Sequence, residues 1–477
     1  MRFYVVARYM AFAFLLNALF LLGSSLIAAF KSEADFFPLF YSFLITLLFG
    51  VFPLIFVPVQ KNISYKEGLL IVVSGWLACC LVGTIPYVLW GGEFTFTNAW
   101  FESVSGYTTT GSSILTDIEA LPMGLLFWRS ATHWIGGIGI IILALAVLPH
   151  MGLSGMILYR SEMSDLSRQN FSYSSRKSME ILLYVYLGLT AIQTVALFIC
   201  GMNLFDAITT SFGTIATGGF SPRNASIAYY DSVAIEVVII VFMILSGIHF
   251  GLLFSTLFGK LNELWKSSVV RLYLLMILIG VVMATLSIYE DNFQSWGSSL
   301  RYALFQVISI GTSTGFATTN SSLWPPLAQV VLLFFTFQCA CAGSTSGGIK
   351  VDRTVIFIKS ITKKLKQLLH PKAVIPIKIG GKALDDTLVT FSLLYIIIYI
   401  CIVFISTLIL TSLGVDSLSA FSGSAATMGN VGPGLGSVGS AGNFAYIPSL
   451  GKWVLSITML LGRLEIFGLI ICFIKSP

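Results

Sequence analysis

The sequence predicts an all-α membrane protein with ten transmembrane helices, the last eight forming four pseudo-repeats around one central pore. Two observations lead to this fold class. Long apolar runs cover most of the 477 residues, and four similar glycine stretches recur at separations of 97 to 117 residues. Each stretch follows a short helix-like segment and lies between two apolar runs. The predicted unit is therefore span, pore half-helix, filter strand, span.

The amino-acid composition argues against a soluble protein. Hydrophobic residues make up 56% of the chain and charged residues only 10%, whereas soluble domains carry about 25% charged residues. A surface this poor in charge must face lipid. The net charge of +6 is spread over the loops and gives no reason to expect nucleic acid as a partner. Motifs of nucleotide-binding loops, zinc proteases and nucleophile elbows do not occur, so we do not expect an enzyme.

A helix needs about 20 apolar residues to cross the core of a bilayer. Ten segments meet this requirement, at residues 6–29, 37–59, 68–90, 126–148, 179–201, 232–257, 269–289, 325–358, 387–412 and 446–474. The first segment is too long for a signal peptide and no A-x-A cleavage site follows it, so we treat it as a span. The eighth is longer than one crossing and contains a polar interruption.

Four half-length segments lie between the paired spans. They are Thr97–Tyr107, Leu204–Thr214, Leu300–Ile310 and Asp416–Ala426. A helix of about 11 residues is about 16 Å long, which is half a membrane. A non-helical strand at this depth is tolerated only where it is buried or lines a water-filled cavity. The four strands that follow these segments therefore imply a pore.

These repeats divide the chain into five parts. We expect two extra N-terminal spans in residues 1–66, pore repeats in 67–160, 161–260, 261–372 and 373–477, and an intramembrane gating loop in the third repeat.

Lysine and arginine predict the orientation, because they concentrate in cytoplasmic loops. If the spans alternate from a cytoplasmic N-terminus, most basic residues fall inside. Those that fall outside are Lys31, Arg129, Arg223, Arg301 and Lys452. We therefore expect the N-terminus in the cytoplasm and the four strands toward the outer side.

The four stretches suit a dehydrated alkali cation, which needs oxygen ligands in place of water. Rings of backbone carbonyls supply them in potassium channels, and glycine adopts the required backbone conformations most easily. The negative C-terminal ends of the half-helices would also favour a cation. The expected ion-binding residues are Thr109, Thr110, Gly111, Ala216, Thr217, Gly218, Ser313, Thr314, Gly315, Asn430, Val431 and Gly432. A plain turn is the alternative for any single stretch, most of all beside Pro433.

A polar segment interrupts the eighth apolar run, below the third strand. It consists of Gly343, Ser344, Thr345, Ser346, Gly347 and Gly348, with Lys350 close behind. Three glycines with three hydroxyl residues will not hold a straight helix in lipid, so we expect a gating loop. The alternative is a kinked helix packed through small residues. Lys350 either belongs to the gate or extends to the inner interface.

Arg463 lies in the middle of the last apolar run, where an arginine is costly and usually functional. We expect it to place a positive charge under the filter or to hold the polar loop by donating to its carbonyls. The alternative is a structural ion pair with Glu465 or another helix, although residues two apart do not face each other on a regular helix. The four histidines have no metal-ligand spacing, and we expect Arg129 and His133 only to anchor the outer end of a helix.

These motifs resemble those of the Trk/Ktr/HKT superfamily of potassium transporters. The resemblance rests on FESVSGYTTTGSS (101–113), ATGGFSP (216–222), GTSTGFATTN (311–320), CAGSTSGGIKVDR (341–353), GNVGPG (429–434) and GRLEIFG (462–468). Two extra spans before the first repeat make the chain similar to the bacterial Trk-type membrane subunit rather than to the shorter Ktr type.

The resemblance implies a homodimer in the bacterial cytoplasmic (inner) membrane, with one pore per protomer and K⁺ as the transported ion. Its filter glycines would be Gly111, Gly218, Gly315 and Gly432, and glycine rather than serine at the first position implies potassium selectivity. Gly343–Lys350 would be the gate and Arg463 its charged neighbour. A cytosolic TrkA-like nucleotide-binding regulatory subunit would open it.

The sequence as a whole therefore predicts potassium uptake through a gated filter of backbone carbonyls. The alternative is a proton- or sodium-coupled potassium symporter, since secondary transporters also use broken helices at the membrane midplane. Glu102 and Glu465 are the candidate acids for such coupling.

Overall fold

The structure is a computed structural model that describes residues 2–58, 65–146, 175–258, 263–289, 291–293, 295–379 and 382–469. The expected repeat boundaries at residues 160/161 and 260/261 lie outside the described residues. So do His150 and the ends of the spans expected at 37–59, 126–148 and 446–474.

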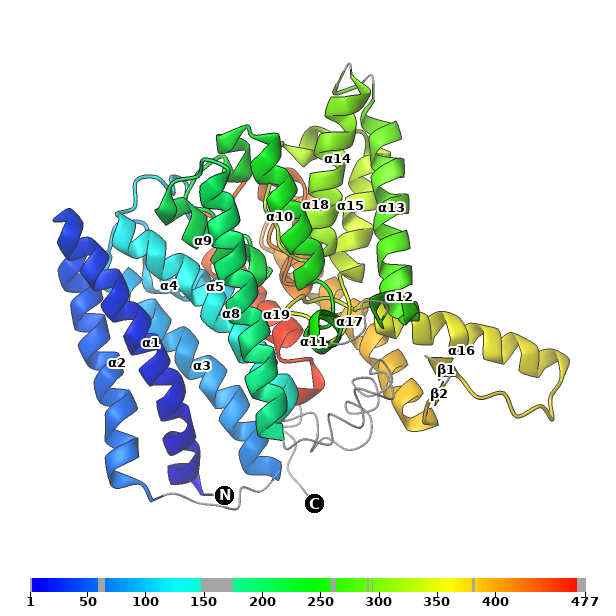
Figure 1. Cartoon of the computed structure of the whole chain (residues 1–477), viewed down its shortest axis with the longest axis horizontal. Helices are drawn as coiled ribbons and strands as arrows, with labels where there is room; N and C mark the ends of the chain where they lie inside the picture. The colour runs from blue at the N-terminus through cyan, green and yellow to red at the C-terminus, as the bar shows by residue number, and fades with distance from the viewer. Residues whose placement is uncertain are drawn as a thin grey trace.

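The described chain is mostly helical (Figure 1). Its α-helices are α1 (Phe3–Lys31), α2 (Phe36–Phe56), α3 (Tyr65–Trp90), α4 (Phe96–Tyr107), α5 (Met123–Ala146), α8 (Ser175–Ile199), α9 (Leu204–Ile215), α10 (Val233–Ser246), α11 (Phe250–Phe258), α12 (Glu263–Lys266), α13 (Ser268–Ile288), α14 (Trp296–Gly311), α15 (Pro326–Gln338), α16 (Val351–Leu369), α17 (Asp386–Ser412), α18 (Ser417–Met428) and α19 (Ser449–Arg463). Short 3₁₀ helices cover Ser226–Tyr230, Ser321–Leu323 and Gly436–Val438. One departure from an all-α fold is a small antiparallel hairpin, β1 (Lys378–Ile379) and β2 (Lys382–Ala383), in which Lys378 pairs with Ala383.

Six helices of the described part are long and apolar enough to cross a membrane: α1, α2, α3, α8, α13 and α17. The helices α10 and α11 make a seventh if they count as one span, but they are bent by 105° at the break between them. The segment expected at 325–358 forms α15 and α16 with a non-helical stretch between them. The polar interruption is therefore a loop, and the kinked-helix alternative is wrong.

The four expected half-helices are present as α4, α9, α14 and α18. Each begins after a residue whose side chain accepts a hydrogen bond from a backbone N–H of the first turn. These residues are Thr95, Asn203, Ser295 and Asp416. Such caps satisfy N–H groups that have no partner inside the helix. The third helix starts four residues earlier than expected, because Ser295 supplies the cap there.

The last helices return to the first ones. Helix α19 packs against both α18 and α4, and α4 also packs against α3 and α5. One core cluster joins Phe101 and Trp128 of the first repeat to Ala420 and Leu455 near the C-terminus. The chain therefore closes on itself around the short helices.

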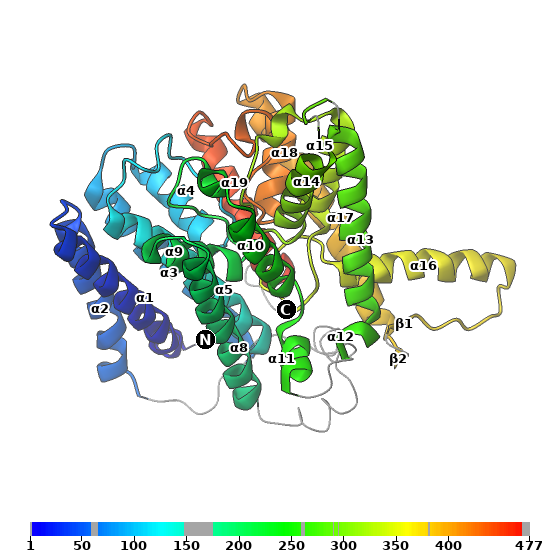
Figure 2. The same cartoon turned by 45° about the horizontal axis from the view of Figure 1, so that its top comes forward.

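The outward faces of the long helices are apolar. Helix α17 buries Tyr395, Tyr399 and Val403 but leaves Phe404 and Leu408 exposed, Leu408 by 69%. An apolar outer face of this kind suits contact with lipid rather than water. Helix α16 differs, because it reaches away from the body of the molecule in both views (Figures 1 and 2).

Candidate functional site

The four short helices end in the same way. After one helical cap residue comes a residue with a φ of 51° to 55°; these residues are Thr109, Thr217, Ser313 and Asn430. The N–H of the next residue donates to a carbonyl five residues earlier, as from Thr110 to Ser105. This is the Schellman pattern of a helix C-terminus. Glycine usually occupies the left-handed position, and a β-branched threonine there is strained. Backbone strain of this kind clusters at functional sites.

The four strands that follow form a closed ring. Two residues after each strained position lies a glycine with a φ of 80° to 96°; these are Gly111, Gly219, Gly315 and Gly432. A methyl group on each would lie 2.1 Å, 2.0 Å, 2.2 Å and 2.6 Å, respectively, from the carbonyl oxygens of Gly218, Thr314, Val431 and Thr110. Each strand thus abuts the next, and the fourth abuts the first. No β-carbon fits at these positions without a shift of the neighbouring backbone.

The second strand departs from the expected register by one residue. The residue equivalent to Gly111 is Gly219, while Gly218 takes the place of Thr110. Ala216 is the helical cap residue of α9 and precedes the strand. The sequence signal for this shift was the pair of adjacent glycines, which leaves two possible registers.

His133 explains why Gly218 has no side chain. A β-carbon on Gly218 would lie 2.5 Å from the His133 ring. That ring stacks on Phe220 at a centroid distance of 4.0 Å, and its Nδ1 lies 2.7 Å from the carbonyl oxygen of Gly106. His133 is therefore more than an anchor of a helix end, because it supports the second strand from behind.

The loop between α15 and α16 lies against three of the helix ends. The Thr345 hydroxyl donates to the carbonyl of Ile215, the last residue of α9, at 3.0 Å. The Gly347 N–H donates to the Ser313 hydroxyl at 3.1 Å. A methyl group on Gly347 would lie 2.2 Å from the carbonyl oxygen of Gly429. The loop thus contacts the second, third and fourth repeats at the side where their strands begin.

Arg463 holds this loop. Its side chain is buried, and Nη1 donates to the Thr345 carbonyl at 2.6 Å while Nη2 donates to the Gly136 carbonyl at 3.3 Å. Within the described residues it makes no ion pair. The expected alternative of a pair with Glu465 is wrong, because Arg463 donates to one carbonyl of the loop, that of Thr345, and to one carbonyl of α5, that of Gly136.

Glu465 instead pairs with the two basic residues at the end of the loop. Lys350 Nζ lies 3.2 Å from Glu465 Oε1, and Arg353 contacts the other carboxylate oxygen. Lys350 is 8% exposed and has a φ of 68°. It is therefore held beside the loop by its ion pair with Glu465.

Comparison with known proteins shows the family. Residues 38–477 match the TrkH family, which is described as a cation transport protein. The chain belongs to the TrkH family. The crystal structure of the potassium transporter TrkH from Vibrio parahaemolyticus superimposes with a TM-score of 0.90 and 35% identity, covering 100% of this chain and 99% of that one. The family consists of transporters rather than enzymes, and the chain is a multi-pass membrane protein.

Individual relatives agree with this membership. The Trk system potassium uptake protein TrkH of Salmonella typhimurium is 40% identical over 418 residues, which are 87% of this chain and 86% of the relative. The protein of the same name from Vibrio parahaemolyticus is 36% identical over 480 residues, covering 99% and 98%. The Trk system potassium uptake protein TrkG of Escherichia coli is 31% identical over 477 residues, covering 98% and 97%.

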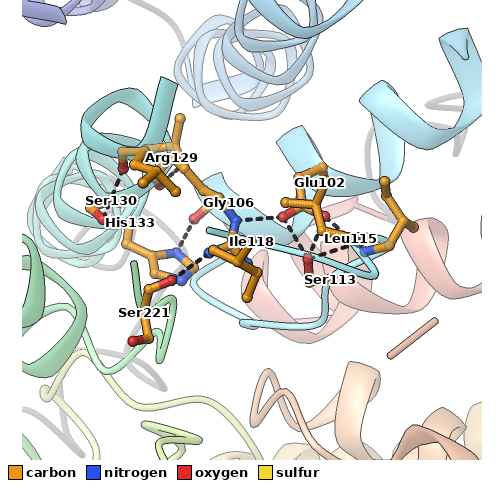
Figure 3. Close-up of polar contacts among 12 residues, drawn as sticks. Glu102, Gly106, Ser113, Leu115, Ile118, Arg129, Ser130, His133 and Ser221 are labelled. Atoms are coloured by element: carbon orange, nitrogen blue, oxygen red, sulfur yellow. Dashed lines mark hydrogen bonds and ion pairs between the residues drawn. The ribbon is translucent and has the colours of Figure 1, made fainter. Parts of the chain in front are cut away.

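A buried ion pair joins two strands of this TrkH family member where they leave the ring (Figure 3). Arg129 Nε donates to Glu102 Oε1 at 2.6 Å, and Arg129 Nη1 donates to the Ser221 carbonyl at 3.0 Å. The other Glu102 oxygen accepts from the Ile114 N–H at 3.0 Å. The Arg129 guanidinium lies 3.6 Å from the centre of the Phe220 ring. The pair therefore fixes the ends of the first and second strands together.

The described residues contain no group of three or more His, Cys, Asp or Glu side chains that could hold a metal ion.

Proposed function

We propose that the protein takes up potassium across the bacterial inner membrane through a filter of backbone carbonyls. The observation that carries this proposal is the closed contact of four strands, each beginning at a residue in the left-handed backbone conformation and containing a glycine. The relatives named Trk system potassium uptake proteins support the choice of ion. The ion ligands would be the carbonyls of residues 109–111, 217–219, 313–315 and 430–432.

The proposed arrangement in the membrane has ten spans, with the last eight in four pseudo-repeats over residues 67–160, 161–260, 261–372 and 373–477. Residues 1–66 add the two extra spans. The N-terminus would be cytoplasmic and the filter would open outward, which the excess of basic residues on one side supports.

Gating is assigned to the loop of Gly343, Ser344, Thr345, Ser346, Gly347 and Gly348, together with Lys350 and Arg463. Its contacts with the starts of three strands support this role. We also propose a homodimer and a cytosolic TrkA-like nucleotide-binding regulatory subunit, on the strength of the family resemblance. Deleting part of Gly343–Gly348 should raise ion flux in the absence of that subunit.

Ion flux into liposomes tests the filter. The purified protein should pass potassium and rubidium well above sodium. Gly315→Ser should weaken this discrimination, because a β-carbon there would lie 2.2 Å from the Val431 carbonyl oxygen. Gly188→Ser is the matched control, since a side chain at Gly188 meets open space. Equal sodium and potassium flux in the unmodified protein would contradict the proposed potassium filter.

Coupling to protons or sodium is the competing function. Its candidate acids are both engaged, since Glu102 pairs with Arg129 and Glu465 pairs with Lys350 and Arg353. A current whose reversal potential follows only the potassium gradient would exclude coupling, whereas a shift with the pH or sodium gradient would support it.

A further inference from the structure

The ring has one junction that chain order does not explain. Three of its contacts join strands of consecutive repeats, but the fourth joins the last strand to the first. Two buried side-chain hydrogen bonds cross this junction. Asn430 Nδ2 donates to Thr110 Oγ1 at 2.9 Å, and the Ser112 hydroxyl donates to the Gly432 carbonyl at 3.0 Å. We call these two bonds the seam.

The residues that donate these bonds differ from their equivalents in the other strands. At the position of Asn430 the others have Thr109, Thr217 and Ser313. Those side chains are shorter, and Ser313 and Thr217 bond to the loop and to the adjacent carbonyl instead. At the position of Ser112 the others have Phe220, Phe316 and Pro433, which carry no side-chain donor. Of the four strands, therefore, only the first and the fourth carry the side chains that donate the two bonds of the seam.

The seam acts on atoms of the ring itself. The Thr110 hydroxyl that accepts from Asn430 also lies 2.7 Å from the Thr108 hydroxyl, so its orientation is fixed from two sides. The Gly432 carbonyl oxygen accepts a hydrogen bond from Ser112, so one of its lone pairs is already used by the protein. A methyl group on Gly432 would lie 2.6 Å from the Thr110 carbonyl oxygen, against 2.0 Å to 2.2 Å for the equivalent distances at the other three junctions. By this measure the seam crosses the least crowded of the four junctions.

We propose that Ser112 and Asn430 are specificity-determining positioning residues, which fix the spacing of the first and fourth strands. This proposal rests on the ring being the ion filter. A carbonyl ring distinguishes potassium from a smaller cation only if its oxygens are held apart or retain their number and field strength. Without the seam, the fourth strand is free to move toward a smaller ion, and the Gly432 carbonyl gains a free lone pair.

The test uses Ser112→Ala, which removes the hydroxyl, and Asn430→Ser, which installs the residue that the third strand carries. In liposomes with defined gradients, both should lower the potassium-to-sodium permeability ratio by about three- to tenfold, the factor that one hydrogen bond typically contributes. Ser112→Thr retains the hydroxyl and should keep the ratio close to that of the unmodified protein.

Ser103→Ala is the control, because it removes a comparable buried hydroxyl bond, to the Cys80 carbonyl at 2.6 Å, that lies outside the ring. If Ser112→Ala does not yield folded protein, Asn430→Ser and the weak donor in Ser112→Cys answer the same question. An unchanged ratio in the conducting variants, or an equal loss in Ser103→Ala, would overturn the seam. A lack of discrimination in the unmodified protein would instead refute the filter.

Discussion

Two buried arginines lie on opposite sides of the ring, and among the described residues only one of them is paired with a carboxylate. Arg129 is paired with Glu102 and donates to a carbonyl where the second strand ends. Arg463 donates to the carbonyls of Thr345 and Gly136, and the described residues offer it no carboxylate partner. Gly136 packs against Tyr107, the last residue of α4, so Arg463 lies at the side where the strands begin.

We propose that this difference separates a charge that only holds the fold together from a charge that acts on the permeating ion. A buried pair is nearly neutral from a distance, and it fixes geometry without repelling a cation. A buried arginine that is bound only by carbonyl dipoles keeps its positive charge, which is costly within a membrane. The protein retains that charge beside the proposed gate, where it would oppose a permeating cation.

The largest effect is expected at the paired arginine. Arg129→Gln leaves Glu102 buried without a counter-charge, which should destabilise the protein by about 3–5 kcal/mol. The yield of monodisperse protein and the thermal midpoint in detergent measure this loss. The double variant Glu102→Gln/Arg129→Gln should recover much of the stability, and a double variant as unstable as the single one would show that charge compensation is not the cause.

The unpaired arginine should behave in the opposite way. Arg463→Gln should keep the fold, because an amide can still donate to the Thr345 carbonyl, but potassium flux without a regulatory subunit should rise about tenfold. Two unit charges about 10 Å apart repel each other by about 1.7 kcal/mol at an effective dielectric constant of 20. Arg463→Lys should stay close to the unmodified flux, and a similar rise in both variants would assign the effect to loop packing.

Asp35, which lies outside the spans, tests at different pH values what a buried charge without a counter-charge costs in stability. Burial, reinforced by the Glu33 carboxylate, raises the pKa of Asp35 to about 6, and Asp35 makes no ion pair within the described residues. The folded protein is therefore most stable below the pKa that Asp35 has in the unfolded chain, where the buried carboxyl group is protonated. This stability is lost as the pH rises through 6 and the buried carboxyl group becomes charged. Asp35→Asn should therefore stabilise the protein at pH 7.5 on the order of 1 kcal/mol, because the amide oxygen can still accept from the Leu125 N–H.

This advantage of Asp35→Asn should shrink as the pH falls from 6 toward 4. Thermal midpoints at pH 7.5 and pH 4.5 measure it. An equal advantage at both values would mean that the charge is not responsible.

The smallest effect is expected for a pair that faces water. Lys363 and Asp386 lie 2.9 Å apart, but the Asp386 side chain is 84% exposed. Asp386→Asn should change stability by less than about 0.5 kcal/mol, because solvent and salt screen exposed pairs. A loss of stability as large as that of Arg129→Gln would contradict the proposal that burial decides how much an ion pair contributes to stability.

Sequence patterns predicted the short helices and the broken eighth span well, but not the details of the ring. Runs of apolar residues and clusters of glycine and hydroxyl residues act locally, so they mark α4, α9, α18 and the loop before α16 closely. The register of the second strand places Gly218 against the ring of His133, which is distant from it in sequence. The adjacent glycines were visible, but the choice between them was not.

Apolar length and glycine content show in the sequence which segments can be helical in lipid and which cannot, because the bilayer imposes those limits on each segment separately. Which charges are compensated, and how the ring closes, depends on tertiary packing. Glu102 and Arg129 are 27 residues apart, and Ser112 and Gly432 are 320 apart. No local pattern encodes such partners, since they meet only after the first and last repeats have packed together.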